Sequence, residues 1–276
     1  MTRIPTAIDP TVEFFDKAAE EYDRQYSANT PAGYALRIRR EKVLNLFDQP
    51  GGKVLDVGCG PAVMTEALLN LGCTFWGVDP SSRMIDIARR RFKENNRVHF
   101  LSGNAMRLDF LDGFFDAAIC MGVIDGLQDR RQAVREMVRV LKPGGTLIIS
   151  FTNLVSPYAF WKKYVFYPVV SIWHGIRDGR AEWRGRSSLG HEAKRRTLCT
   201  ENAARDLLCS EGMNVVQAEG YYHNLLLSPL DEIWPTGALW VTRQLEESRW
   251  PKPQWLAAGR IVKARKERFA ARHGVR

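Results

Sequence analysis

Short apolar runs alternate through the middle of the chain with longer segments in which apolar residues recur every three or four positions. A short apolar run is typical of a strand buried on both faces, and the longer pattern is typical of an amphipathic helix. The runs predict strands at residues 54–57, 74–78, 98–101, 115–120 and 146–151, with helices at 63–71 and 130–141. Strands and helices that alternate in this order form a parallel sheet with right-handed crossovers.

The same patterns predict the elements on either side of this region. Residues 11–28 and 34–47 are expected to form amphipathic helices, and Pro31-Ala32-Gly33 is interpreted as a break between them. Residues 152–196 mix aromatic, basic, glycine and proline residues, which predicts an inserted and partly helical cap.

The remainder of the chain is expected to complete the sheet. The predicted elements are a helix at 198–211 with Thr200 as its N-cap, a sixth strand at 215–222, a seventh at 238–242 and a basic helix at 253–276. The chain therefore divides into an N-terminal helical lid (1–50), a ligand-binding core (51–151), the cap (152–196), the completion of the sheet (197–250) and a basic C-terminal helix (251–276).

A glycine turn follows the first predicted strand. Gly58 and Gly60 permit positive φ and let a ligand approach the backbone, while the next helix presents free N–H groups. A dinucleotide site would favour a third glycine where the chain has Val63, and a phosphate-binding loop would require a Lys-Ser/Thr pair that is absent after Gly60. The ligand class that remains is a nucleoside attached to an amino acid.

Asp79 ends the second predicted strand, one strand–helix unit after Gly58. A carboxylate at that position accepts hydrogen bonds from both hydroxyls of a ribose. Either feature alone is weak evidence. The glycine turn and the carboxylate in register within one unit together predict a nucleoside pocket.

Five segments within residues 53–150 follow one another in the order and spacing of a known family: LDVGCGPA, GVDPSSRMIDIARRR, GNAMRLDF, FDAAICMGVIDGLQD and RVLKPGGTLIIS. On these segments the chain resembles the class I S-adenosylmethionine-dependent methyltransferases. The resemblance implies an α/β fold with a doubly wound, Rossmann-like sheet of seven mostly parallel strands, the last antiparallel between the fifth and sixth. It also implies S-adenosyl-L-methionine as cofactor and S-adenosyl-L-homocysteine as product.

The resemblance assigns cofactor contacts to residues of these segments. They are Asp56, Gly58, Cys59 and Gly60 for the amino-acid moiety, Asp79 with Pro80 for the ribose, Met84, Asn104 and Ala105 for the adenine, and Met121 near the sulfonium. The family usually has Asp-Ala where this chain has Asn104-Ala105, and an amide oxygen still accepts from the adenine amino group. In the family the first helix covers the cofactor, so Tyr22 is a candidate contact, with aromatic packing beside Tyr26 as the alternative.

Methyl transfer from a sulfonium is an in-line displacement in which a catalytic base is optional. Asp125, after the fourth predicted strand, is the first candidate base, where many relatives have histidine. The alternative is a turn residue before Gly126. His191 and His223 are further candidates, each with a hydrogen-bonding role as its alternative.

Charge and cysteine content narrow the class of protein. The net charge of +9 would attract an anionic substrate, an acidic membrane surface or nucleic acid. The five scattered cysteines lack zinc-site spacing, so a reduced, cytoplasmic protein without a metal is expected. No apolar run approaches the ~20 residues of a membrane span. Residues 1–15 lack the apolar region of a secretory signal.

Aromatic and basic side chains share the predicted cap, where Trp161, Tyr164 and Trp173 lie among Lys162 and Arg177. This mixture favours the boundary between membrane and water. Together with the apolar residues of 225–234 it suggests a mouth that admits a lipid-like acceptor. The alternatives are that the two segments pack on each other as a lid or form a dimer contact.

These observations predict a methyltransferase acting on a small-molecule acceptor, by O-methylation of a hydrophobic or lipid-like biosynthetic intermediate. N- or C-methylation of a small metabolite is the second choice, and a non-catalytic nucleoside-binding protein is a further alternative. RNA methylation ranks lower, because neither an RNA-binding module nor an Asn-Pro-Pro-Tyr motif accompanies the core. The expected location is the cytoplasm, with peripheral membrane contact as an option, and the oligomeric state stays open.

Overall fold

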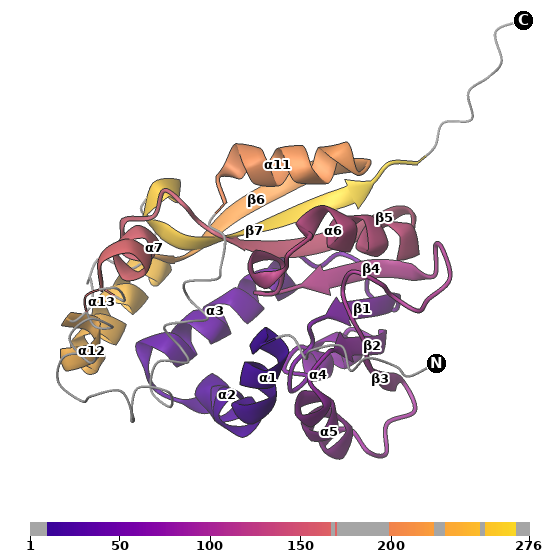
Figure 1. Cartoon of the computed structure of the whole chain (residues 1–276), viewed down its shortest axis with the longest axis horizontal. Coiled ribbons are helices and arrows are strands. Elements are labelled where there is room, and N and C mark those ends of the chain that lie inside the picture. Colours follow the sequence, from indigo (N-terminus) through magenta and orange to yellow (C-terminus); the bar gives the residue numbers. More distant parts are fainter. Residues whose placement is uncertain (1–9, 167–168, 170–198, 224–229, 249–251, 269–276) are drawn as a thin grey trace, which may run out of the picture.

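The computed structural model describes residues 10–166, 169, 199–223, 230–248 and 252–268. A seven-stranded sheet in the order β3-β2-β1-β4-β5-β7-β6 forms its centre, with helices on both faces (Figure 1). Neighbouring strands pair in parallel except β7, which is antiparallel to both β5 and β6. The strands are β1 (Lys53–Val57), β2 (Thr74–Asp79), β3 (Val98–Ser102), β4 (Phe115–Cys120), β5 (Leu141–Thr152), β6 (Met213–His223) and β7 (Ala257–Lys266). The α/β, Rossmann-like fold implied by the resemblance is confirmed.

A loop without a helix joins β3 to β4, and the other consecutive strands are separated by helices, as the apolar pattern predicted after β1 and β4. Those of the core are α4 (Thr65–Asn70), α5 (Ser82–Arg91), α6 (Arg130–Val140) and α11 (Glu201–Ser210), with a 3₁₀ turn η1 (Ile124–Gly126) after β4. Polar caps fix several of their starts. The Ser81 hydroxyl accepts from the N–H of Met84, and Thr200 caps α11 by accepting from the N–H of Ala203, as predicted.

The N-terminal segment forms three helices, α1 (Pro10–Lys17), α2 (Ala19–Ser27) and α3 (Pro31–Leu46). The single helix predicted over 11–28 is therefore two helices that meet at Ala18. The predicted break at Pro31 is instead the start of α3, because Thr30 caps the helix by accepting from the N–H of Gly33. Proline is favoured at a first helical position, where its missing N–H is not needed.

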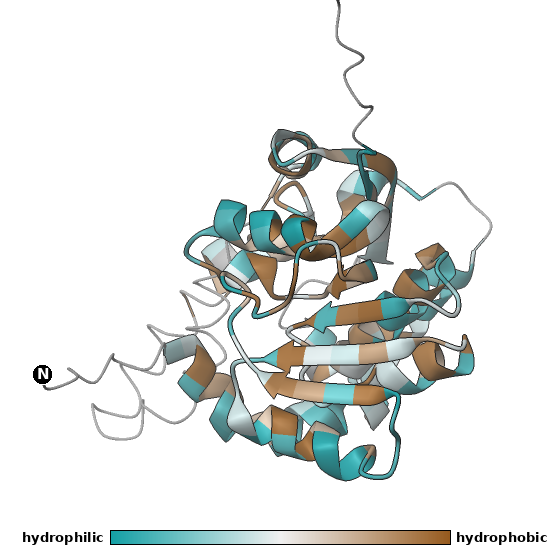
Figure 2. Ribbon diagram, turned by 90° about the vertical axis from the view of Figure 1, so that its right-hand side faces the viewer, coloured by the Kyte–Doolittle hydropathy of each residue, from teal (hydrophilic) through white to brown (hydrophobic). Residues whose placement is uncertain are grey.

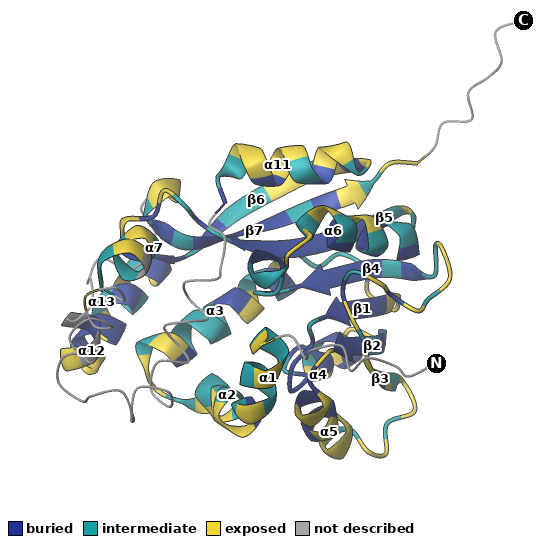
Figure 3. Ribbon diagram, in the orientation of Figure 1, coloured by how far each residue is buried: buried dark blue, intermediate teal, exposed yellow. Residues whose placement is uncertain are grey.

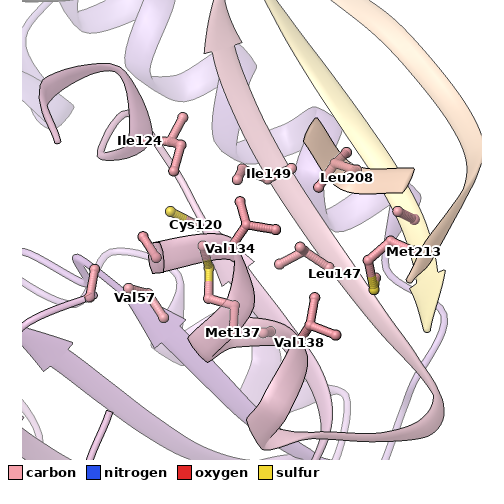
Figure 4. Packing of buried hydrophobic residues seen from close by; sticks show 14 of the residues in the cluster. Val57, Cys120, Ile124, Val134, Met137, Val138, Leu147, Ile149, Leu208 and Met213 are labelled. Carbon is pink, nitrogen blue, oxygen red and sulfur yellow. The ribbon is translucent and has the colours of Figure 1, made fainter. Parts of the chain in front are cut away.

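Two hydrophobic cores occupy the two faces of the sheet. Successive β4 residues point to opposite faces, so Ala118 and Cys120 join one core, whereas Ala117 and Ile119 join the other. Figure 4 shows the first core, in which α6 packs on the strands. Apolar and polar residues both occur along the helices in Figure 2, and the inner strands β1, β4 and β5 are largely buried in Figure 3, whereas the edge strands β3 and β6 are more exposed. This double coverage explains why the parallel strands appear as unbroken apolar runs.

Two predictions for the end of the chain are wrong. Residues 238–242 lie within helix α13 (Pro235–Glu247), and 257–266 form β7, where a basic helix over 251–276 was predicted. The seventh strand therefore lies outside the predicted segment 197–250, although its antiparallel place between β5 and β6 was expected. The basic residues misled the prediction because carboxylates outside the sheet pair with them: Arg260 pairs with Glu201 of α11, and Lys263 lies 2.8 Å from Asp48, which follows α3.

Only the start of the predicted cap, residues 152–166 with 169, falls within the described residues. It contains α7 (Pro157–Trp161) and the π-helix η2 (Lys162–Phe166), and residues 167–168 and 170–196 lie outside the description. Beside α7 lie α12 (Leu230–Ile233), α13 and the 3₁₀ turn η3 (Gln254–Leu256), at the end toward which the parallel strands point (left in Figure 1).

Candidate active site

The glycine turn after β1 lies at the carboxyl edge of the sheet, as predicted. Gly58 and Gly60 have φ of +75° and +51°. The N–H groups of Gly58 and Cys59 both donate to Val78 O on β2, at 2.7 and 3.1 Å. A side chain at Gly58 would meet Val123 Cγ2 at 2.1 Å, so the turn and the loop after β4 approach each other closely. The two glycines thus let the turn after β1, the end of β2 and the loop after β4 approach one another around one small space.

Asp79 closes that space from the end of β2. Its Oδ2 accepts from the N–H of Gly60 and its Oδ1 from the N–H of Ser81, both at 2.9 Å. The carboxylate is buried, and burial raises the pKa of Asp79 in spite of these two hydrogen bonds. It therefore holds the glycine turn in place while it retains lone pairs for further donors.

Asp56 lies beneath the turn on β1 and is also buried. Burial, and secondarily the negative charge of Asp79, raise the pKa of Asp56 to about 7, although Arg39 opposes the shift. Because burial makes the ionised form of Asp56 unfavourable, a cation bound beside it would stabilise the carboxylate.

Arg39 is a site residue that the sequence did not single out. It projects from α3, it is buried, and it lines one pocket with Asp56, Tyr22 and Tyr26. The Tyr26 hydroxyl lies within hydrogen-bond reach of its guanidinium. Three arginines stand close together on α3, and only the helix packing reveals which one turns inward.

The side chains around the glycine turn enclose two adjoining cavities, of about 30 and about 140 Å³. The smaller is the polar pocket of Arg39 and Asp56, and the larger runs past Asp79 beneath Phe15 of α1. A depression of about 770 Å³ lined by residues 90–97 is larger, but it is an open hollow of the surface. The enclosed pair of cavities is therefore the better candidate for a ligand site.

Most of the predicted cofactor residues line these cavities. They are Tyr22, Asp56, Gly58, Cys59, Gly60, Asp79, Pro80, Met84 and Met121. Asn104 and Ala105 lie outside this set. Asn104 is exposed, and its Oδ1 accepts from the N–H of Met106 at 2.8 Å, which closes a local turn. Their contact with adenine stays a prediction.

Asp125 is placed away from the lining of the cavities, although its neighbour Gly126 is part of that lining. Its carboxylate is buried, accepts from the N–H of Thr152 at 2.5 Å and lies 3.6 Å from the Arg130 guanidinium. These contacts join η1 to β5 and α6. The geometry thus favours the turn-residue alternative for Asp125.

His223, at the end of β6, is buried as well and outside the described cavity lining. Its Nδ1 lies 2.8 Å from Oε1 of Glu246 on α13, and the same oxygen accepts from the His223 N–H at 2.8 Å. Burial opposes ionisation of Glu246, but the hydrogen bonds from His223 outweigh it and lower the pKa of Glu246. His191, the third candidate, lies outside the described residues.

The described residues also bear on two other expectations. They contain no cluster of three or more His, Cys, Asp or Glu side chains suited to a metal ion. Within the same residues, none of the helices has the length and apolar character needed to cross a bilayer. Cys59, Cys73 and Cys120 are free and buried, as predicted for small core residues.

Comparison with known proteins identifies the class. Residues 55–149 match the family model described as a methyltransferase domain. A demethylmenaquinone methyltransferase of Bacillus mycoides is 30% identical over 161 residues, which cover 56% of this chain and 67% of the relative. A ubiquinone biosynthesis O-methyltransferase of Xanthomonas campestris is 33% identical over 153 residues, 52% of this chain and 62% of the relative.

A solved structure extends the similarity of fold beyond that region. The magnesium protoporphyrin IX methyltransferase of Synechocystis, with bound S-adenosylhomocysteine, superposes with a TM-score of 0.58 at 16% identity, covering 94% of this chain and all of that one. The chain belongs to the class I S-adenosylmethionine-dependent methyltransferases, and it is an enzyme of that class.

Proposed function

We propose that the paired cavities bind S-adenosylmethionine, with its amino-acid moiety between α3 and the glycine turn and its ribose at Asp79. The observation that carries this proposal is a pair of opposite, buried charges, Arg39 and Asp56, in one small pocket. An amino acid presents one carboxylate and one ammonium, and these two side chains complement them. Asp79 keeps acceptor capacity for ribose hydroxyls, because each of its oxygens accepts only one of the backbone bonds.

Bound S-adenosylmethionine would supply a methyl group on a sulfonium, which an acceptor attacks in line while the carbon–sulfur bonding electrons return to sulfur. The contribution of this chain is alignment and exclusion of water. Thr11, Val12 and Phe15 of α1 line one side of the larger cavity. The loop after β4 lines another side through Met121, Gly122, Val123, Gly126 and Leu127. Alignment of two reactants can account for ~7–11 kcal/mol of a barrier. A nucleophilic acceptor would therefore react without a side-chain base.

We infer that the acceptor is a small hydrophobic molecule of quinone type, methylated on oxygen. Two observations support this inference. The relatives at about 30% identity are named for menaquinone and ubiquinone pathways, one of them as an O-methyltransferase. Exposed aromatic side chains also lie near the end of β6, on α7 and α13. N- or C-methylation of a small metabolite remains the second candidate.

Calorimetric titration of S-adenosylmethionine and S-adenosylhomocysteine tests the cofactor site. Wild type should bind both, Asp79→Ala should lose at least about tenfold in affinity, and Arg39→Met should lose a similar factor. Asp86→Ala on the exposed face of α5 is the matched control and should bind as wild type does. Equal affinities in all four proteins would refute the assignment.

A screen with methyl-labelled cofactor tests the acceptor. Hydroxylated quinols with long and short apolar tails, aromatic amines and total RNA are offered separately. Label in the quinol ether, with preference for the longer tail, is the expected result. Label confined to amines would refute O-methylation and favour N-methylation instead. Label in RNA would refute a small-molecule acceptor.

A further inference from the structure

Five large apolar side chains remain exposed at the end of the sheet where the parallel strands finish. They are Phe160, Tyr164, Ile233, Trp234 and Trp240, with exposed fractions between 51% and 73%. They come from α7, η2, α12 and α13, which Figure 1 shows at the same end of the molecule. We call these five residues the aromatic surface.

The side chains of the aromatic surface are ordered by their own helices. The Trp234 ring lies over the first turn of α13, so close that a side chain at Gly237 would meet it at 2.2 Å. Trp240 follows Gly237 by three positions and therefore lies on the same helix face as that ring. Phe160 and Tyr164 form a second pair, with ring centroids 4.9 Å apart.

A buried polar contact connects the two halves of the aromatic surface. Asp231 on α12 accepts from the Tyr158 hydroxyl of α7 at 2.9 Å and lies 3.3 Å from the Lys162 ammonium of η2. Asp231 is only 4% exposed, and the Lys162 ammonium also lies 4.9 Å from the Tyr158 ring. The contact fixes α12 against α7, so the exposed side chains of these two helices are held in a fixed relative position.

The chemistry of this surface matches the boundary of a lipid bilayer. Tryptophan and tyrosine are enriched at membrane–water interfaces, because an apolar ring carries one polar group. An exposed apolar patch of this kind marks an interaction site. The chain that begins at η2, residues 162–196, contains nine Lys or Arg against three Asp or Glu, a net +6 of the total +9. Anionic lipid headgroups attract such a segment, whereas a neutral apolar partner does not.

We propose that the aromatic surface docks on an anionic lipid bilayer, which brings the carboxyl edge of the sheet to the membrane. The purpose of this docking, access to a lipid-like acceptor, rests on the proposed function. The docking itself does not, because it requires neither cofactor nor acceptor. A second copy of this chain is the competing occupant of the same surface.

Vesicle co-sedimentation of the full chain tests the proposal. Wild type should bind vesicles with about one third phosphatidylglycerol in phosphatidylcholine, and bind more weakly to pure phosphatidylcholine or at 0.5 M salt. The double variant Trp234→Ser/Trp240→Ser should lose at least about tenfold in partition coefficient. The matched control is Leu111→Ser/Val216→Ser, which removes two exposed apolar side chains from other parts of the surface and should bind as wild type does.

Three results would overturn the proposal. One is the absence of wild-type binding to anionic vesicles, and another is equal loss in the tryptophan and control variants. The third is a wild-type dimer in sedimentation velocity that the tryptophan variant alone converts to monomers, since the occupant would then be a second copy. Titration of S-adenosylmethionine into the same variants separates this question from the cofactor site, because the aromatic surface lies outside the cavity lining and affinity should not change.

Discussion

Replacing Gly58 with alanine would add a methyl group that disturbs the loops around the candidate site. Gly58 and Gly51 have the same φ of +75°, but a side chain at Gly58 would meet Val123 at 2.1 Å, whereas none of the described atoms lies within 4 Å at Gly51. Alanine at either position should cost about 1 kcal/mol of unfolding free energy for the left-handed backbone. Gly58→Ala should in addition displace the loop after β4 and weaken cofactor binding at least about tenfold. Urea unfolding and calorimetry on both variants separate the two effects. Equal cofactor affinity in the two variants would contradict the role of the close approach.

The raised pKa of Asp56, about 7, predicts a pH-dependent affinity for the cofactor. Below that pH the free enzyme carries a neutral Asp56, so binding an ammonium requires the loss of a proton. Affinity should then fall by up to about tenfold per pH unit between pH 7 and 5. Asp56→Asn should bind weakly and without this slope. A wild-type affinity that stays constant from pH 8 to 5 would show that Asp56 does not face the ammonium.

The same shift has the opposite consequence for stability. The unfolded chain releases the Asp56 proton near pH 3.8 and the native chain near 7, so the native state holds the proton between these values. The contribution of Asp56 to unfolding free energy consequently falls as pH rises through that window. Asp56→Asn should be more stable than wild type at pH 8, by about 1–3 kcal/mol, and similar at pH 4. Urea unfolding at the two pH values measures the difference.

How far the sequence predicts the site differs from residue to residue. Gly58, Gly60 and Asp79 are recognisable because the proposed cofactor site requires a residue type at a fixed place along the chain. Arg39 is not, because its role depends on which side of α3 faces the glycine turn, and that follows from packing between distant elements. Asp125 shows the converse. Its position in the loop after β4 suggested a base, but the direction of its side chain is set by Thr152 and Arg130.

At the scale of elements, Asp125 joins η1 to the strand and helix that follow it. Asp125→Ala would leave the partly buried N–H of Thr152 without its acceptor, which should cost about 1–3 kcal/mol of unfolding free energy. Asp109→Ala, at an exposed residue, is the control and should change stability by less than about 0.5 kcal/mol. Unfolding and steady-state kinetics are measured together. If kcat fell more than about a hundredfold with stability unchanged, and its pH profile flattened, Asp125 would be the base after all.

The elements that sequence patterns predicted correctly are those with a continuous apolar face. From β1 to β5, helices separate the strands everywhere except between β3 and β4, and each apolar run there fits only a strand. The errors fall at the end of the chain, where a short apolar run and a basic run each fit both a helix and a strand. Tertiary contacts determine the structure of both segments. Ala238 and Thr242 are buried one helical turn apart in α13, and Arg260 on β7 forms an ion pair with Glu201. Local patterns hold no information about such partners.

At the scale of the whole molecule, the N-terminal helices cover the cavity with little packing of their own. α1 contains no buried residue, and α1 and α2 meet α5 through a small cluster around Ala19 and Met84. The surface contacts that add to it include an ion pair in which Nη2 of Arg91 donates to both carboxylate oxygens of Asp23, each at 2.8 Å. Elements with few buried contacts open at low free energy. We therefore propose that a cofactor enters when α1 and α2 open.

Saturating S-adenosylhomocysteine should consequently slow amide hydrogen exchange in residues 10–27 far more than at the exposed end of β7. At a ligand concentration of about a hundred times Kd, the ligand adds about 2.7 kcal/mol to every opening that releases it. Openings of α1 and α2 belong to that set, whereas local fraying at the exposed end of β7 does not. Mass spectrometry of exchange with and without the ligand distinguishes the regions, and Asp79→Ala, which should bind more weakly, should show correspondingly less protection at the same ligand concentration. Protection confined to the strands would mean that the cofactor enters by another route and that the N-terminal helices are a fixed wall.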